Sequence, residues 1–142
     1  MNDSAILQPV VVLVLWSLVM WAWLYATRIP AIQRAKVPLE PTGTKEQMNA
    51  ALPPQVRWKA DNYNHLMEQP TVFYAAAFSL ALLERGQGAP LALAWGYVGL
   101  RIVHSLLQAT WNKIEVRFML FALSSLALIG MLVVAVQAAL LG

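Results

Sequence analysis

Residues Arg57 to Leu83 read RWKADNYNHLMEQPTVFYAAAFSLALL, a polar segment that passes directly into an apolar one. Charged and amide side chains crowd the first half, and after Gln69 no charged side chain appears until Glu84. A polar helix needs water or protein around it, whereas an uncharged apolar helix suits a core or a lipid bilayer. The fold depends on what surrounds each half.

The composition of the whole chain indicates a membrane. The chain has 142 residues, of which 59% are hydrophobic and 12% charged, and its mean hydropathy is +0.56. Soluble domains are about 45–50% apolar. Ile6–Ala26 and Phe118–Gly142 carry no charge, and each is long enough to cross a hydrocarbon core of about 30 Å. We therefore predict an integral membrane protein with two clear spans.

Two further spans are expected between these. Thr71–Leu83 is apolar but short, and Leu91–Thr110 carries Arg101 and His104 near its middle. Each crosses as a helix if its polar positions turn away from lipid. We predict an all-α, integral membrane four-helix bundle that forms a single membrane domain over 1–142. Its helices are expected at about 5–28, 54–84, 90–111 and 116–141, with a proline-containing cytoplasmic loop at 29–53.

Charge predicts the orientation of a multi-pass protein with four spans. The first and third loops then share one side, whereas the other side holds Arg85 beside Glu84. The positive-inside rule places the basic loops in the cytoplasm and both termini outside, in a plasma or inner membrane. The basic residues near these loops are Arg28, Arg34, Lys36, Lys45, Arg57, Lys59, Lys113 and Arg117.

The sequence does not favour nucleic-acid binding, chemistry on a cysteine of the chain or metal binding. The pI of about 9.5 is explained by this topology, and no RNA- or DNA-binding pattern is present, so we expect no nucleic-acid partner. The chain has no cysteine, so any thiol chemistry needs a substrate's sulfur. The histidines and carboxylates are too scattered for metal-ligand spacing, and we expect no metal site.

Two polar stripes are expected to face each other. At about 100° per residue, one stripe follows the second helix and the other follows the third. Glu68 lies deep along the second helix and needs a cationic or hydrogen-bonding partner, for which Arg101 is the natural candidate. We infer a polar cavity, open to the cytoplasm, that holds charged ligand groups; helix–helix hydrogen bonding alone is the alternative. The stripes comprise Arg57, Asp61, Asn64, Glu68 and Thr71, and Arg101, Ser105, Gln108 and Asn112.

The chain resembles the MAPEG family, the membrane-associated proteins in eicosanoid and glutathione metabolism. The resemblance covers nearly the whole chain and is carried by KADNYNHLMEQP (Lys59–Pro70) and by GLRIVHSLLQATWNKIEVR (Gly99–Arg117). It implies homotrimers of four-helix subunits within membrane lipid, with glutathione as co-substrate at the subunit interfaces. The implied glutathione-binding residues are Arg57 or Lys59, Asn64, Glu68, His104 and Arg117, with Arg28 reaching in from a neighbouring subunit. The residue that carries catalysis is not identified.

The chain departs from the family pattern at defined positions. Asn64 and Glu68 are four positions apart, whereas members of the family often have these two residues three apart. Glu68 and Pro70 are two positions apart, whereas members often have a spacing of three or four. Gln108 is a further candidate glutathione-binding residue. It occupies the position at which the eicosanoid-type enzymes have a tyrosine. Phe118 and Phe121 stand where prostaglandin E synthase has a serine and a tyrosine. A specialised prostaglandin or leukotriene activity is not expected.

Three functions remain open at the level of sequence. The first is a glutathione-dependent transferase or peroxidase that acts on small hydrophobic electrophiles or lipid hydroperoxides. The second is a catalytically silent lipid-binding protein or scaffold of the same fold. The third is a small proton-coupled transporter using Glu68 and His104. The sequence does not identify the electrophile, nor does it show that glutathione rather than another thiol is used.

Overall fold

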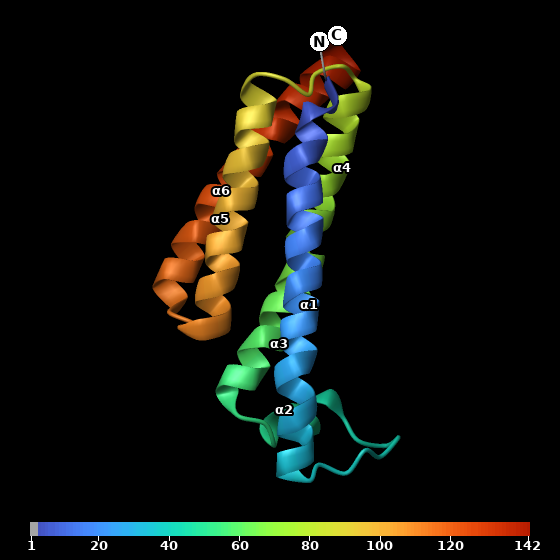
Figure 1. The fold of residues 1–142 in the computed structure, drawn as a ribbon. Helices are drawn as coiled ribbons and strands as arrows, with labels where there is room; N and C mark the ends of the chain where they lie inside the picture. Colours follow the sequence, from blue (N-terminus) through green and yellow to red (C-terminus); the bar gives the residue numbers. More distant parts are fainter. Residues whose placement is uncertain (1–2) are drawn as a thin grey trace.

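The computed structural model describes residues 3–142, and these residues form helices and connecting segments with no strand (Figure 1). The chain opens with a 3-10 turn, η1, and closes with a π-helical turn, η2. Six α-helices lie between them. The elements are η1 (Asp3–Ile6), α1 (Leu7–Ala35), α2 (Lys45–Ala50), α3 (Pro54–Met67), α4 (Gln69–Leu82), α5 (Ala89–Thr110), α6 (Ile114–Val136) and η2 (Gln137–Leu141).

The connection between α1 and α3 contains the short helix α2. Thr44 caps α2 by accepting a hydrogen bond from the backbone N–H of Gln47, whose side chain accepts one from the backbone of Thr44. This reciprocal capping box suits a helix too short to be stable by propensity alone. Arg28 donates a hydrogen bond to Asn49 at 3.1 Å. The connection is thereby attached to the end of α1.

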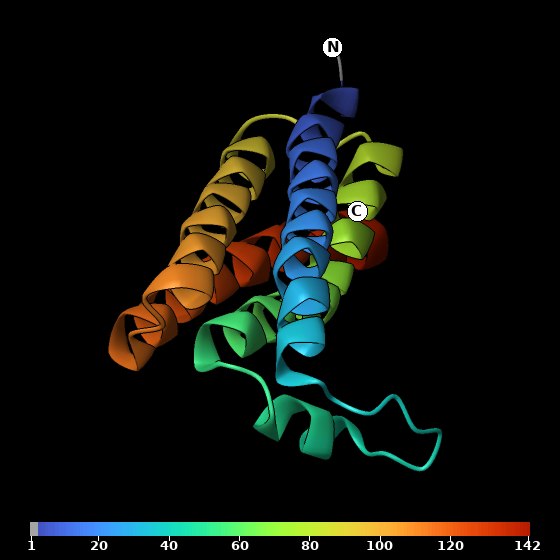
Figure 2. The ribbon, with the colours of Figure 1, turned by 60° about the horizontal axis from the view of Figure 1, so that its bottom comes forward.

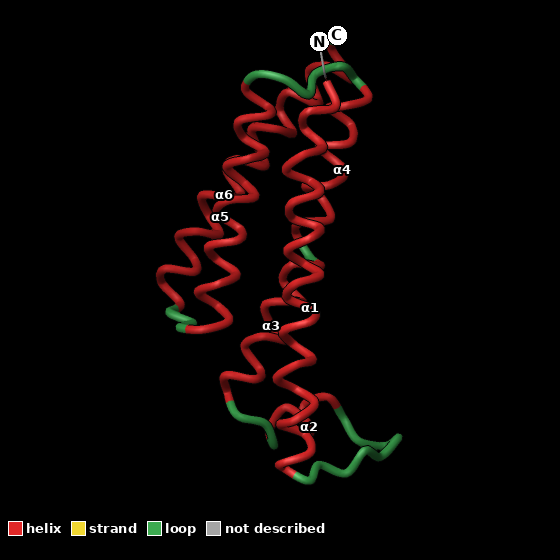
Figure 3. Tube along the Cα trace, viewed as in Figure 1, coloured by secondary structure: helices red, strands yellow, loops and turns green. Residues whose placement is uncertain are grey.

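The polar and apolar halves of the opening stretch form two separate helices. The chain bends at Glu68, where φ is −89° and ψ is −98° (Figure 3). Pro70 explains the break, because it has no N–H to donate to the carbonyl of Leu66 and its ring would clash with that turn. Proline is well tolerated in the first turn of the next helix, α4, which is where it lies.

The helices pack side by side around a shared apolar core (Figures 1 and 2). α1 contacts α3, α4 and α5, while α6 contacts α5 and α4. In the core, the rings of Phe73 and Tyr97 stack with centroids 4.5 Å apart, which joins α4 to α5. Met20 and Met131 are fully buried on α1 and α6. The buried apolar residues of α1, α4, α5 and α6 thus face one another.

Among residues 3–142, three helical segments are long and apolar enough to cross a membrane: Ser4–Ala35, Ala89–Thr110 and Ile114–Leu141. The bend leaves α3 and α4 with 14 residues each, about 21 Å at 1.5 Å per residue and short of a bilayer core. η1, η2 and the α4–α5 connection lie at one end of the molecule (Figure 1). The α5–α6 turn and the α1–α3 connection lie toward the other end (Figure 1).

Candidate functional site

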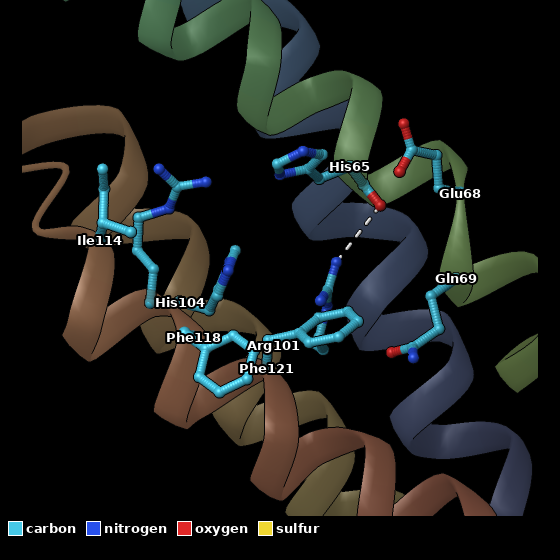
Figure 4. Close-up of a pocket in the computed structure, with 9 residues that line it drawn as sticks. His65, Glu68, Gln69, Arg101, His104, Ile114, Phe118 and Phe121 are labelled. Carbon is cyan, nitrogen blue, oxygen red and sulfur yellow. Dashed lines mark hydrogen bonds between the residues drawn. The ribbon is translucent and has the colours of Figure 1, made fainter.

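A cavity of about 320 Å³ lies between the α3–α4 bend and the α5–α6 pair (Figure 4). The bend contributes one acidic and two other polar side chains, α5 contributes a guanidinium and an imidazole, and α6 contributes a second guanidinium and the apolar wall. Cationic and apolar groups therefore meet in one space. The lining residues are His65, Glu68, Gln69, Arg101, His104, Ile114, Arg117, Phe118 and Phe121.

Arg101 is the most buried charge at the cavity, with 2% of its side chain exposed. One nitrogen, Nη2, donates a hydrogen bond to the main-chain carbonyl of His65 at 3.2 Å (Figure 4). Its Nε and Nη1 atoms are buried without a hydrogen-bond partner. Its guanidinium carbon also lies 5.9 Å from the ring centroid of Phe121, within range of a cation–π contact. A buried guanidinium with unused donors is expensive for the fold alone.

The expected pairing of Arg101 with the Glu68 carboxylate is wrong. Glu68 is exposed at the bend, and the hydrogen bond of Arg101 goes to the backbone of His65 instead. The bend explains the difference, because it interrupts the helical stripe that was to carry Glu68 toward α5. Both charges still line the same cavity, so a ligand that enters meets an unpaired carboxylate and an incompletely bonded guanidinium.

A second, more polar cavity of about 370 Å³ adjoins the first and shares His65, Glu68 and Arg117 with it. At their boundary, His65 Nδ1 lies 2.9 Å from Oε1 of Gln108. Gln108 is itself 2% exposed. Arg117 donates a hydrogen bond to Asn112 through Nη1, while its Nε is buried without a partner. The second cavity is lined by Asp61, Asn64, His65, Glu68, Gln108, Asn112 and Arg117.

Gln69 fixes the start of α4 against the two helices across the cavity. Its Oε1 accepts a hydrogen bond from the Tyr97 hydroxyl at 3.1 Å, and its Nε2 donates to Ser125 at 3.0 Å. Ser125 in turn donates to the carbonyl of Phe121. Gln69 thereby connects α4, α5 and α6 beside the bend, which holds the neighbouring Glu68 at the cavity.

The structure separates the predicted site residues into two groups. Asn64, Glu68, Arg101, His104, Gln108 and Arg117 line the two adjoining cavities. Arg28, Arg57 and Lys59 line neither. Arg28 bonds to α2, the Nε of Arg57 is buried without a partner, and Lys59 lines a different cavity beside α1. The single polar stripe predicted for 54–84 does not form one surface.

Sequence reasoning did not select His65 or Gln69 as site residues, and it placed Asp61 on the polar stripe without naming it as a glutathione-binding residue. The structure places His65, just before the bend, at the boundary of both cavities. The proline two positions beyond Glu68 was the available signal, because a break there changes which side chains share a face. Among residues 3–142, no group of three or more His, Asp or Glu side chains is placed to hold a metal ion.

Comparison with known families agrees with this architecture. The model of the MAPEG family matches residues 6–137, nearly the whole chain. No curated protein and no solved structure matches the chain. The chain belongs to the MAPEG family, and its apolar helices and this membership together make it a membrane protein.

Proposed function

We propose that the protein is a membrane-embedded glutathione-dependent transferase or peroxidase that acts on hydrophobic electrophiles or lipid hydroperoxides. The observation that carries this proposal is the convergence of Glu68, Arg101, His104 and Arg117 on one cavity. Membership of a family associated with glutathione metabolism supports it. The cavity volume of about 320 Å³ lies in the usual range for small-molecule sites, about 300–1,000 Å³.

The charges of the cavity complement those of glutathione. Glutathione carries two carboxylates and one ammonium group, so it needs two cationic contacts and one anionic contact. Arg101 and Arg117 are the proposed carboxylate partners, because a guanidinium binds a carboxylate through paired N–H groups. Glu68 is the proposed partner of the ammonium. Nearby cations also favour the thiolate over the thiol, and the thiolate is the nucleophile.

The other wall of the cavity suits a hydrophobic second substrate. Phe118 is 70% exposed and Phe121 is 40% exposed, and both lie on the same side of α6 as Ile114. A molecule dissolved in the bilayer reaches such a wall without crossing water. Attack of the thiolate sulfur on an electrophilic carbon would expel its leaving group. Attack on a peroxide oxygen would instead break the O–O bond, releasing an alcohol and leaving glutathione sulfenic acid. A second glutathione would convert the sulfenic acid to glutathione disulfide and water.

We assign acceptance of the thiol proton to His65. Gln108 Oε1 is an acceptor, so the hydrogen bond at 2.9 Å requires the proton of a neutral His65 to be on Nδ1. The other ring nitrogen, Nε2, is then the basic atom. His65 is part of both cavities, whereas His104 lines one of them and is 4% exposed.

A catalytically silent, lipid-binding scaffold is the second candidate, and one observation favours it. None of the side chains that line the 320 Å³ cavity carries a hydroxyl group. A hydroxyl hydrogen bond that stabilises a thiolate is therefore missing from this wall. The three unpaired or partly paired charges favour the enzyme, because a surface that binds only the apolar part of a lipid has no need of them.

We further propose four membrane crossings and a homotrimer. α3 and α4 together supply the fourth crossing, with the polar α3 shielded from lipid by its neighbours. Their polar face is too broad for one chain to cover, which favours assembly of several copies. In such an assembly Arg28 can reach the glutathione site of a neighbouring subunit if its hydrogen bond to Asn49 on α2 breaks. Native mass measurement in mild detergent tests the trimer, and a clean monomer that still binds glutathione would overturn the shared site.

The decisive experiment measures glutathione binding and thiolate absorbance with purified protein. Arg117→Ala is expected to weaken glutathione binding by about 2 kcal/mol. This value is at the low end of the range for loss of a charged partner, because Arg117 is partly exposed. Glu68→Gln is expected to cost about 1 kcal/mol, because Glu68 is exposed to screening by water. Arg85→Ala and Glu115→Gln, outside both cavities, serve as matched controls. All four variants should fold.

Turnover separates the enzyme from the scaffold. A generic aryl halide tests conjugation, and a lipid hydroperoxide tests reduction, since both reactions use the same thiolate. Absence of a thiolate signal and of turnover with both substrates, together with unchanged glutathione binding in the two site variants, would replace the enzyme by the scaffold.

A further inference from the structure

A separate basic cavity of about 620 Å³ lies between the end of α1 and the start of α3. It shares no residue with the two cavities of the proposed glutathione site. Two cations line it, Arg34 from α1 and Lys59 from α3, and none of its lining residues is acidic. The lining of the cavity therefore carries a net positive charge.

Lys59 is the unusual member of this cavity, because it is 9% exposed and yet has no anionic partner within the part of the chain that the structure describes. Its Nζ donates to the main-chain carbonyls of Gln55 at 3.1 Å and Ala109 at 3.4 Å. It also lies 5.0 Å from the ring centroid of Trp23. These groups orient the ammonium without neutralising it. Burial of such a charge is costly unless an anion completes the site.

The walls of the cavity are apolar and reach the uncharged part of α1. They include Ala26, at the end of the uncharged run Ile6–Ala26, as well as Pro30, Ala31 and Val56. Beside them Ile29 is 51% exposed, so the outer surface of α1 remains apolar at this depth. The cavity thus spans the level at which α1 changes from uncharged to basic, which is the expected level of phospholipid headgroups.

We propose that this cavity binds the phosphate headgroup of an anionic phospholipid. Arg34 and Lys59 contact the phosphate, and the acyl chains lie along the exposed apolar surface of α1. Basic pockets between helices near a membrane surface bind phospholipid headgroups in this way, through charge-assisted hydrogen bonds. The apolar walls favour a lipid over a free phosphate ion, which gains nothing from them. This assignment is independent of the proposed reaction with glutathione.

Native mass spectrometry of the purified protein tests the proposal, with the bound lipid molecules counted per protein chain. The protein is titrated with phosphatidylglycerol or with phosphatidylcholine of the same acyl chains. We expect wild-type protein to retain phosphatidylglycerol about tenfold more than phosphatidylcholine. Arg34→Gln and Lys59→Gln should each reduce that preference about fivefold, as loss of one cation near a phosphate predicts.

Lys113→Gln is the matched control. Lys113 lies at the α5–α6 turn, with Nζ 5.3 Å from the ring centroid of Trp111, but it does not line the cavity. The control should keep the wild-type preference. Arg34 is exposed, so Arg34→Gln decides the outcome even if the buried Lys59→Gln variant fails to fold.

Four results would overturn the proposal. Equal retention of the two lipids by wild-type protein would show that the headgroup charge is not recognised. An Arg34→Gln variant that keeps the wild-type preference for phosphatidylglycerol would show that this cavity does not recognise the headgroup. A Lys113→Gln control whose preference falls as far as that of the cavity variants would show the same. Displacement of phosphatidylglycerol by millimolar inorganic phosphate would identify a site for free phosphate rather than for lipid.

Discussion

Arg101 on α5 donates a hydrogen bond through Nη2 to the main-chain carbonyl of His65, at 3.2 Å, in the last turn of α3. The bend at Glu68 follows that turn, so the carbonyl lies where regular helical bonding is ending. One guanidinium therefore both joins α5 to the bend and lines the cavity. This single bond leaves Nε and Nη1 of Arg101 without partners.

The substitution Arg101→Met is expected to separate function from stability. It removes a buried charge with two unpartnered nitrogen atoms and fills the space with an apolar side chain, so stability should change by less than about 1 kcal/mol or increase. Glutathione binding should fall about tenfold or more, because a proposed carboxylate partner is lost. Thermal unfolding in detergent and binding isotherms measure the two effects. A large loss of stability with intact binding would make Arg101 a structural residue.

Pro70→Ala tests whether the bend matters to the site. Alanine restores the N–H that can bond to the carbonyl of Leu66, so α3 and α4 should approach one continuous helix. Glu68 would then be carried toward Arg101 on α5, where an ion pair would compete with the ligand, and glutathione binding should weaken several-fold. Spin labels on cysteines introduced at the exposed positions Asp61 and Leu82 report the bend as a distance, since the chain has no native cysteine. An unchanged distance with weakened binding would assign the effect to local packing instead.

Tyr97→Phe tests the contacts that hold α4 at the cavity. The change removes the hydroxyl donor to Gln69 and leaves Gln69 Oε1 without that bond, which should cost about 1 kcal/mol. Stacking of the ring on Phe73 is retained. Denaturant unfolding measures the loss. Tyr25→Phe, at a residue that is 45% exposed, is the control and should be neutral; equal losses in both variants would contradict the assignment.

The sequence predicted the helices better than it predicted the site. Uncharged runs such as Phe118–Gly142 specify membrane helices through composition alone, which needs no knowledge of neighbours. The site depends instead on which face of its helix each side chain occupies. Pro70 breaks the segment predicted as one helix, so side chains before and after the bend no longer share a face. Within α3 itself, Lys59 and His65 are six positions and therefore about 240° apart around the helix. Lys59 thus faces α1 and Trp23, whereas His65 faces Gln108.

The orientation in the membrane is tested by a cysteine at Thr44, in the connection between α1 and α2. If the basic connections are cytoplasmic, as the positive-inside rule predicts, Thr44→Cys resists a membrane-impermeant thiol reagent in intact cells and reacts after permeabilisation. A cysteine at Gln87, in the connection between α4 and α5, should react in intact cells. Ready labelling at position 44 without permeabilisation would reverse the orientation and, with it, the side from which glutathione enters.

The proposed role of His65 leads to the most discriminating substitution, His65→Asn. The asparagine amide occupies roughly the position of Nδ1, so the hydrogen bond to Gln108 can be kept while the basic Nε2 is removed. If Nε2 accepts the thiol proton, turnover should fall about a hundredfold or more, the usual contribution of a general base, and the rate should rise with pH as solvent takes over. Glutathione affinity should stay within about twofold. His104→Asn is the matched control, and it should leave the shape of the pH–rate profile unchanged. Parallel losses of binding and turnover in His65→Asn would make His65 a structural partner of Gln108, and a changed profile in His104→Asn alone would transfer the role to the imidazole on α5.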